Sequence, residues 1–163
     1  MFEKLKGLLD GGGIAVYAPV AGDLLSMTQV DDPTFRDGML GVGVAIKPTE
    51  NRIVAPVDGV VALMFDTGHA VSVTATEGGA EVLIHVGLDT VRLKGEHFKI
   101  VARTGDAVKR GDPLIEFDRE AIAAEGYDTI TPVVITNADE FSRIDLATQT
   151  PVEALDRIMS LHK

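Results

Sequence analysis

Short apolar runs separated by turn-forming residues constrain the fold of this chain more than any other feature. From Ile14 onward, runs rich in Val, Ile and Leu are interrupted by Gly, Pro, Asp or Asn about every eight to twelve residues. This spacing is typical of short strands joined by tight turns. The pattern therefore predicts an all-β fold, mostly antiparallel, arranged as a β-sandwich or barrel.

The length of the chain predicts one hydrophobic core. A chain of 163 residues buries about two-thirds of its unfolded surface, so it needs no disulfide or metal for stability. We expect a single domain over residues 14–163 and a separate tail over residues 1–13 that is flexible or amphipathic. The tail is interpreted either as a frayed end or as a weak contact with a membrane surface. Its apolar residues at helical spacing are Phe2, Leu5, Leu8 and Leu9, and three glycines follow them.

One segment is repeated within the predicted domain. A-P-V-A-G-D-L-L-S-M at 18–27 returns as A-P-V-D-G-V-V-A-L-M at 55–64. The repeat indicates either duplicated hairpins in one sheet system or a chance similarity of two strand starts. Neither interpretation makes the repeat catalytic.

Short helices are expected towards the end of the chain. Asp118 can cap a helix over R-E-A-I-A-A-E, and T-P-V-V-I-T-N at 131–137 then predicts a buried strand. The capping box at 150–153 has Pro at the first helical position and is followed by apolar residues at helical spacing. These local signals predict a terminal helix.

Composition and charge exclude several classes of function. Cysteine is absent, so the chain has no disulfide framework, thiol nucleophile or cysteine metal site. The formal net charge of −10 argues against nucleic acid, because phosphate backbones attract Lys and Arg surfaces. No apolar run approaches the length of a membrane span, about 18 residues. The start of the sequence lacks the features of a signal peptide, which favours the cytoplasm.

Two of the four histidines lie in neighbouring apolar stretches. His69 lies in F-D-T-G-H-A-V-S-V, and His85 lies in V-L-I-H-V-G-L-D-T-V. Because side chains in a strand alternate between faces, the register decides whether the two rings meet. A two-residue turn at Gly78-Gly79 would place them on opposite faces of the sheet. A loop centred on Glu77 would place them directly opposite one another, with Cβ atoms about 5 Å apart.

Thr67 and Asp89 accompany this pair in sequence. A neutral imidazole carries one N–H, so a ring nitrogen held by Thr67 or a backbone carbonyl leaves the other free as a nucleophile or ligand. His97 and His162 have no such companions, and we interpret them as ordinary core or surface residues.

A zinc-dependent hydrolase of similar β architecture is the main alternative. Such a site needs three protein ligands and an open water position, so His69, His85 and Asp89 would have to serve. No H-x-H or H-E-x-x-H spacing occurs in the sequence. We therefore expect no metal bound by this chain alone, and zinc only where a partner adds a carboxylate.

A biotinyl- or lipoyl-type carrier is a second alternative, suggested by the rhythm of residues 101–114. That class needs an exposed lysine at a hairpin tip within a short motif around methionine. No such motif is found.

The stretches F-D-T-G-H-A-V-S-V and G-G-A-E-V-L-I-H-V-G-L-D-T-V-R-L-K-G-E-H-F closely resemble the glucose-type IIA component of the bacterial phosphoenolpyruvate-dependent sugar phosphotransferase system. The I-H-V-G-L-D-T-V string is the most specific part. The resemblance covers about residues 14–145. Further similar segments are G-V-G-V-A-I-K-P at 41–48, A-P-V-D-G-V-V at 55–61, G-D-P-L-I-E-F-D at 111–118 and T-P-V-V-I-T-N at 131–137.

The resemblance implies a phosphohistidine carrier on a β-sandwich or barrel-sandwich of the duplicated hybrid motif type, with short helices at the ends. His85 would accept a phosphoryl group through Nε2 from the phosphohistidine of the small carrier HPr. His69 would stabilise the group in transit, and Thr67 would fix the tautomer of His69. Asp32 and Asp89 would meet a basic residue of HPr. The apolar rim of the site would be Phe35, Phe65 and Leu83, for which ordinary core packing is equally open.

The resemblance also implies the partners. The phosphoryl group next moves to a cysteine of a IIB domain, and because this sequence has no cysteine we expect that domain on another chain, as part of a sugar permease. We expect a monomer, and a regulatory partner is left open. Ala154 stands where the family's closing strand has glycine, so the conformation of residues 150–163 is also left open.

Overall fold

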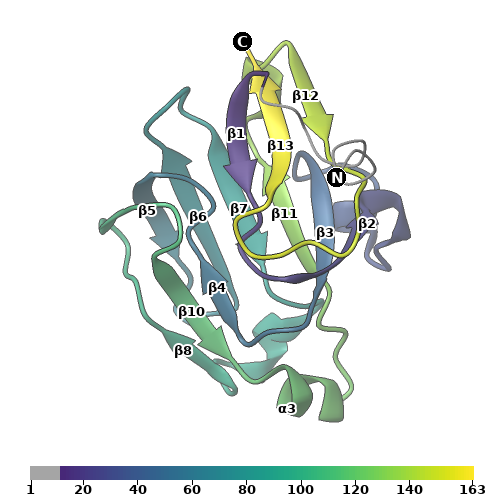
Figure 1. Cartoon of the computed structure of the whole chain (residues 1–163). Coiled ribbons are helices and arrows are strands. Elements are labelled where there is room, and N and C mark those ends of the chain that lie inside the picture. Colours follow the sequence, from purple (N-terminus) through teal and green to yellow (C-terminus); the bar gives the residue numbers. More distant parts are fainter. Residues whose placement is uncertain (1–11) are drawn as a thin grey trace.

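The computed structural model describes residues 12–163, which form antiparallel β-sheets with short helical turns between the strands (Figure 1). The all-β, mostly antiparallel fold predicted from the sequence is confirmed. The helical elements are η1 (Met27–Gln29), α2 (Pro33–Arg36), η2 (Thr90–Leu93), α3 (Arg119–Ala124) and η3 (Ala138–Glu140). The strands are β1 (Ile14–Tyr17), β2 (Gly22–Ser26), β3 (Val42–Pro48), β4 (Arg52–Val54), β5 (Gly59–Met64), β6 (Ala70–Ala75), β7 (Glu81–His85), β8 (Phe98–Ile100), β9 (Ala107–Val108), β10 (Pro113–Phe117), β11 (Thr131–Ile135), β12 (Arg143–Leu146) and β13 (Arg157–His162).

The largest sheet has seven strands in the order β2-β3-β11-β7-β6-β5-β9. On β6 and β7, Val71 pairs with Ile84 and Val73 with Val82, and all four side chains are fully buried. The residues between them project to the other side of the sheet because side chains alternate along a strand. The sheet therefore has a core face and a second face, and Leu83 and His85 lie on the second.

Two three-stranded sheets, β1-β13-β12 and β4-β10-β8, cover the core face (Figure 1). Val16 and Leu161 from the first sheet and Ile53 and Ile115 from the second are fully buried in one cluster with the core-facing residues of β6 and β7. Burial of each such side chain stabilises the fold by about 1.5–3 kcal/mol. The result is a sandwich around one core.

A smaller apolar cluster lies on the second face of the large sheet. Met27 of η1, Val30 and Phe35 of α2 pack there against Ala45 of β3 and Val134 of β11. The segment between β2 and β3 is thereby held over the sheet, next to the end of β7. This packing positions the candidate site.

The repeated segment begins two strands of the same sheet. Gly22 starts β2, which pairs with β3, and Gly59 starts β5, which pairs with β6. A Cβ atom at Gly22 would lie 2.0 Å from the carbonyl oxygen of Lys47, and one at Gly59 would lie 2.0 Å from that of Thr74. The same close approach of a neighbouring backbone requires glycine in both copies, which agrees with the interpretation of duplicated hairpins.

Of the two conformations left open for residues 150–163, the helix favoured by local signals does not form, because Arg157–His162 form β13 between β1 and β12. Ile158, Met159 and Leu161 are fully buried there. Instead of starting a helix, Val152 exchanges backbone hydrogen bonds with Gly22 at 2.8 and 3.0 Å. Strand pairing on both sides and burial of the apolar residues outweigh the local capping signal, which stabilises a helix by only about 1 kcal/mol.

Two other local predictions are confirmed. The Asp118 carboxylate accepts a hydrogen bond from the Ala121 N–H at 3.0 Å and caps α3, which is followed by Gly126 in the left-handed region. All five residues of β11 are buried.

Within residues 12–163, no helix combines the length and the apolar character needed to cross a membrane. Residues 1–11 of the predicted tail lie outside the described residues. The expected flexible or amphipathic character of the tail therefore stays a prediction.

Candidate functional site

His85 is the last residue of β7, on the second face of the sheet, and its ring is half-buried. Its Nδ1–H donates a hydrogen bond to the carbonyl oxygen of Gly87 at 2.6 Å. This hydrogen bond places the ring proton on Nδ1 and leaves a lone pair on Nε2. The chain bends back to make the bond possible: Gly87 has φ +79°, and a Cβ atom there would lie 2.5 Å from Cγ2 of Thr90.

His69 does not lie in a strand, contrary to the prediction. The Phe65 N–H donates to the Ala70 carbonyl at 3.1 Å and closes a loop of residues 66–69 between β5 and β6. His69 is the last residue of this loop and follows Gly68, which has φ +71°. The loop, rather than strand alternation, sets the direction of the His69 ring.

The register, which the sequence left open, matches neither of the two turns considered. Ala70, not His69, pairs with His85, because residues 76–79 form the turn between β6 and β7. Continued as a regular strand, His69 would point to the core face with Val71. The two rings meet because His69 lies in the loop before β6 and not in a regular strand.

The two imidazoles contact each other edge to face. Their ring centroids are 4.9 Å apart with an interplanar angle of 82°. The Thr67 hydroxyl hydrogen bonds to Nδ1 of His69, so Nε2 is the ring nitrogen that Thr67 does not bind. The structure therefore brings Thr67, His69 and His85 together, as the sequence predicts, although by a different route.

Two phenylalanines flank the pair. Phe35 packs on His85 with centroids 5.1 Å apart, and Phe65 packs on His69 at 5.3 Å. Phe35 is only 4% exposed, so it is a core residue beneath the site. Phe65 and Leu83 are half-buried and form the accessible apolar rim.

Burial lowers the pKa of both imidazoles. For His69, desolvation and then the nearby His85 lower the pKa from 6.5 to about 4. For His85, desolvation lowers the pKa, while the hydrogen bond to Gly87 and the charges of Asp32 and Asp89 act in the opposite direction. Both rings are therefore neutral near pH 7, and Nε2 of His85 can act as a nucleophile.

The two predicted acidic residues lie on loops beside His85. The Asp32 carboxylate caps α2 by accepting a hydrogen bond from the Thr34 N–H at 2.9 Å. Asp89 is exposed and has φ +57°, directly before η2. Both carboxylates favour the protonated form of the His85 ring, so they place negative charge at the mouth of the site, by which we mean the surface around His85.

The other two histidines have carboxylate partners that are distant in sequence, as ordinary hydrogen-bonded residues do. His97 hydrogen bonds to Glu125, and His162 contacts Asp145 at 2.9 Å. These partners lie 28 and 17 residues away in sequence, so no local pattern reveals them.

Sequence reasoning also missed Gly87, whose carbonyl orients His85. The glycine two residues after the histidine in I-H-V-G was the available signal, because a left-handed residue there turns the chain back towards the ring.

The geometry does not favour the zinc hydrolase. Within residues 12–163, the one group of three or more potential metal ligands lies elsewhere, at Glu96, His97 and Glu125. No third ligand therefore joins His69 and His85 within this described part of the chain. A pair of neutral rings with one free Nε2 instead suits transfer of a small group.

A family model described as phosphoenolpyruvate-dependent sugar phosphotransferase system, EIIA 1, matches residues 14–141, which include the whole histidine site. The chain belongs to this family. The resemblance drawn from the histidine-containing segments is thereby confirmed, and the protein is a component of the sugar phosphotransferase system.

Relatives of this EIIA chain agree with the assignment. It is 43% identical over 146 residues to the PTS system glucose-specific EIIA component of Haemophilus influenzae, covering 88% of this chain and 87% of the relative. It is 50% identical over 139 residues to the PTS system beta-glucoside-specific EIIBCA component of Dickeya chrysanthemi, covering 85% of this chain but only 22% of that relative. The chain thus spans about a fifth of the length of this multi-component relative.

A solved structure has the same fold. Glucose permease IIA from Mycoplasma capricolum superposes with a TM-score of 0.80 and 30% sequence identity, covering 91% of this EIIA chain and 96% of the other.

Proposed function

We propose that this EIIA chain is a phosphohistidine carrier that accepts a phosphoryl group from HPr on Nε2 of His85 and passes it to a cysteine of a IIB domain. The observation that carries the proposal is the hydrogen bond from Nδ1 of His85 to Gly87, which leaves Nε2 with a lone pair beside a second neutral imidazole. The sequence contains no cysteine, so the acceptor lies outside these 163 residues.

In the first step, the Nε2 lone pair of His85 attacks the phosphorus of the phosphohistidine on HPr. The new N–P bond forms as the old N–P bond breaks, and the HPr imidazole leaves with the bonding electrons. In the second step, a IIB cysteine thiolate attacks the same phosphorus, and His85 leaves. Because such transfers pass through a loose transition state, catalysis depends mainly on positioning and charge stabilisation.

His69 supplies the charge stabilisation in this proposal. The Thr67 hydroxyl hydrogen bonds to Nδ1 of His69, and in the proposed tautomer the hydroxyl donates, so that the ring proton lies on Nε2. That N–H can donate to a phosphoryl oxygen held on His85. Burial keeps His69 from becoming a fixed imidazolium, so it favours the group in flight without holding the phosphorylated state too tightly.

The surroundings of the pair suit a transient protein partner. Asp32 and Asp89 give the mouth a negative charge that can meet a basic residue of HPr, and Phe65 and Leu83 provide an apolar rim that keeps water from the phosphoryl group. No metal or organic cofactor is needed for this chemistry.

The test is incubation with phosphoenolpyruvate, enzyme I and HPr, followed by intact mass. One acid-labile phosphoryl group should be added to the wild type and to His162→Gln, the matched histidine control, and none to His85→Ala. An unchanged wild-type mass would overturn the proposal. Deletion of residues 1–10 should leave this phosphorylation intact.

A second assay separates the roles of the two histidines. His69→Gln should accept the phosphoryl group but transfer it slowly to a purified IIB domain, because the second imidazole acts on the group in flight. Onward transfer at the wild-type rate would remove His69 from the mechanism.

A further inference from the structure

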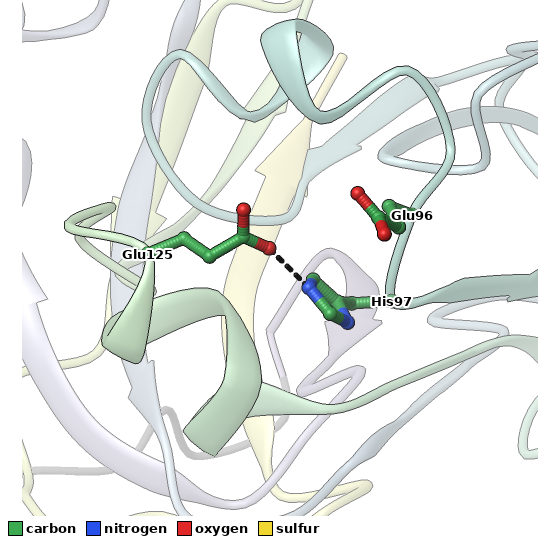
Figure 2. Close-up of side chains that lie close together, drawn as sticks. All are labelled: Glu96, His97 and Glu125. Carbon is green, nitrogen blue, oxygen red and sulfur yellow. Dashed lines mark hydrogen bonds and ion pairs between the residues drawn. The ribbon is translucent and has the colours of Figure 1, made fainter.

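A second cluster of ionisable side chains lies away from the histidine pair. Figure 2 shows Glu96 and His97, on the turn between η2 and β8, beside Glu125 at the end of α3. One potential ligand atom from each of the three residues lies within 4.8 Å of the other two. Nε2 of His97 already hydrogen bonds to a carboxylate oxygen of Glu125.

Main-chain hydrogen bonds fix the backbone that presents these side chains. The Glu96 N–H donates to the Leu93 carbonyl at 3.0 Å, and the Asp118 N–H donates to the His97 carbonyl at 3.0 Å. The Glu125 N–H donates to carbonyls of the last turn of α3. Only side-chain rotations are therefore needed to bring the three groups closer together.

The cluster has more negative charge than the histidine can balance. His97 can carry at most one positive charge against two carboxylates, and within residues 12–163 the Glu96 carboxylate has no hydrogen bond or ion pair of its own. Glu125 also lies at the carbonyl end of α3, where cations are favoured and anions are not. A divalent cation would relieve both conflicts.

We propose that Glu96, His97 and Glu125 form a binding site for Zn²⁺. Zinc takes histidine nitrogen and carboxylate oxygen at about 2.0–2.2 Å in tetrahedral sites, which sets neighbouring ligand atoms about 3.3 Å apart. Rotation of the two exposed glutamates can bring the present separations, which are at most 4.8 Å, to this value. The ion replaces the proton between His97 and Glu125, and water fills the fourth position.

The ion would tie the turn before β8 to α3. That turn lies against the histidine site, because a Cβ atom at Gly95 would be 3.6 Å from the carbonyl oxygen of Thr67. The zinc site differs from the sequence expectation, which assigned no metal to this chain alone. It is also independent of the proposed phosphoryl transfer.

The test is titration of the metal-free, full-length protein with ZnCl₂, followed by calorimetry and by native mass spectrometry. We expect one zinc ion per chain. His97→Gln should weaken binding by about tenfold or more, and Glu96→Gln and Glu125→Gln should weaken it in the same direction. Glu120→Gln, which removes an exposed charge from the same helix, is the matched control and should leave the affinity within about twofold.

Zinc captured by the histidine pair is the main competing result. The titration is therefore repeated in the His69→Gln/His85→Gln double variant, where binding should persist with the same affinity. Co²⁺ in place of zinc should give the visible absorption of a four-coordinate site, which His97→Gln abolishes. Binding that survives His97→Gln unchanged, binding lost in the double variant, or no binding at all would each overturn the proposal.

Discussion

In mild acid, the variant His69→Gln should lose less stability than the wild type does. His69 is 4% exposed, and its pKa is lowered from 6.5 to about 4, chiefly by burial. The unfolded chain therefore binds a proton more readily than the folded protein does. The contribution of His69 to the free energy of unfolding is therefore fully present above about pH 6.5. It is lost as the pH falls from there towards 4.

The magnitude follows from the two pKa values. One pKa unit corresponds to about 1.4 kcal/mol, so the full loss attributable to His69 is about 3 kcal/mol below pH 4. At pH 5, where most folded molecules still hold His69 neutral, the loss is about 2 kcal/mol. His85 changes stability in the same direction, since its pKa is also lowered.

Urea unfolding of the wild type and of His69→Gln at pH 8, 6.5 and 5 measures this effect. The wild type should lose about 2 kcal/mol more than the variant between pH 8 and pH 5. Because all other titrating groups are shared, the difference reports His69 together with its coupling to His85. A difference that stays constant over this range would show that His69 is not held neutral by burial, and the mechanism proposed for it would fail with that result.

Three further substitutions test how the site is built. Gly87→Ala should cost about 2 kcal/mol or more, because the left-handed backbone and the 2.5 Å approach to Thr90 leave no room for a methyl group, and urea unfolding measures the loss. Phe35→Ala should cost about 3–5 kcal/mol in the same assay, since the buried ring packs on His85. Thr67→Val should keep stability within about 1 kcal/mol but slow onward phosphoryl transfer about tenfold or more, because the tautomer of the neighbouring imidazole is no longer fixed.

Each substitution has an outcome that would contradict its reasoning. Wild-type stability of Gly87→Ala would mean that the turn after β7 adapts freely. A loss below about 1 kcal/mol in Phe35→Ala would remove that ring from the small cluster on the second face. Normal transfer by Thr67→Val would show that the hydroxyl does not control the tautomer. Val60→Ala, at a side chain 45% exposed, is the stability control and should change little.

The sequence by itself determined those features that depend on neighbouring residues. The rhythm of short apolar runs fixed the all-β class, Asp118 marked the start of α3, and the burial of β11 followed from its continuous apolar run. The hydrogen bond that orients His85 is also local, because its acceptor, the carbonyl of Gly87, lies only two residues later. Local sterics and hydrogen bonding are sufficient to explain each of these.

The tertiary structure decided what depends on contacts between distant segments. The capping signal at residues 150–153 favoured a helix, but β1 and β12 offered the last segment two strand partners and a buried position. His97 and Glu125 meet because the turn before β8 lies next to the start of α3, where the Asp118 N–H donates to the His97 carbonyl, not because of any spacing in the chain.

The histidine pair shows the division most clearly. Strand alternation alone would have sent His69 into the core, and the register observed between β6 and β7 does not align it with His85. His69 instead lies in the loop of residues 66–69, which the hydrogen bond from the Phe65 N–H to the Ala70 carbonyl closes, and its ring contacts His85. The sequence identified the two residues. Only the folded loop, closed by a hydrogen bond between residues on either side of it, brought their rings into contact.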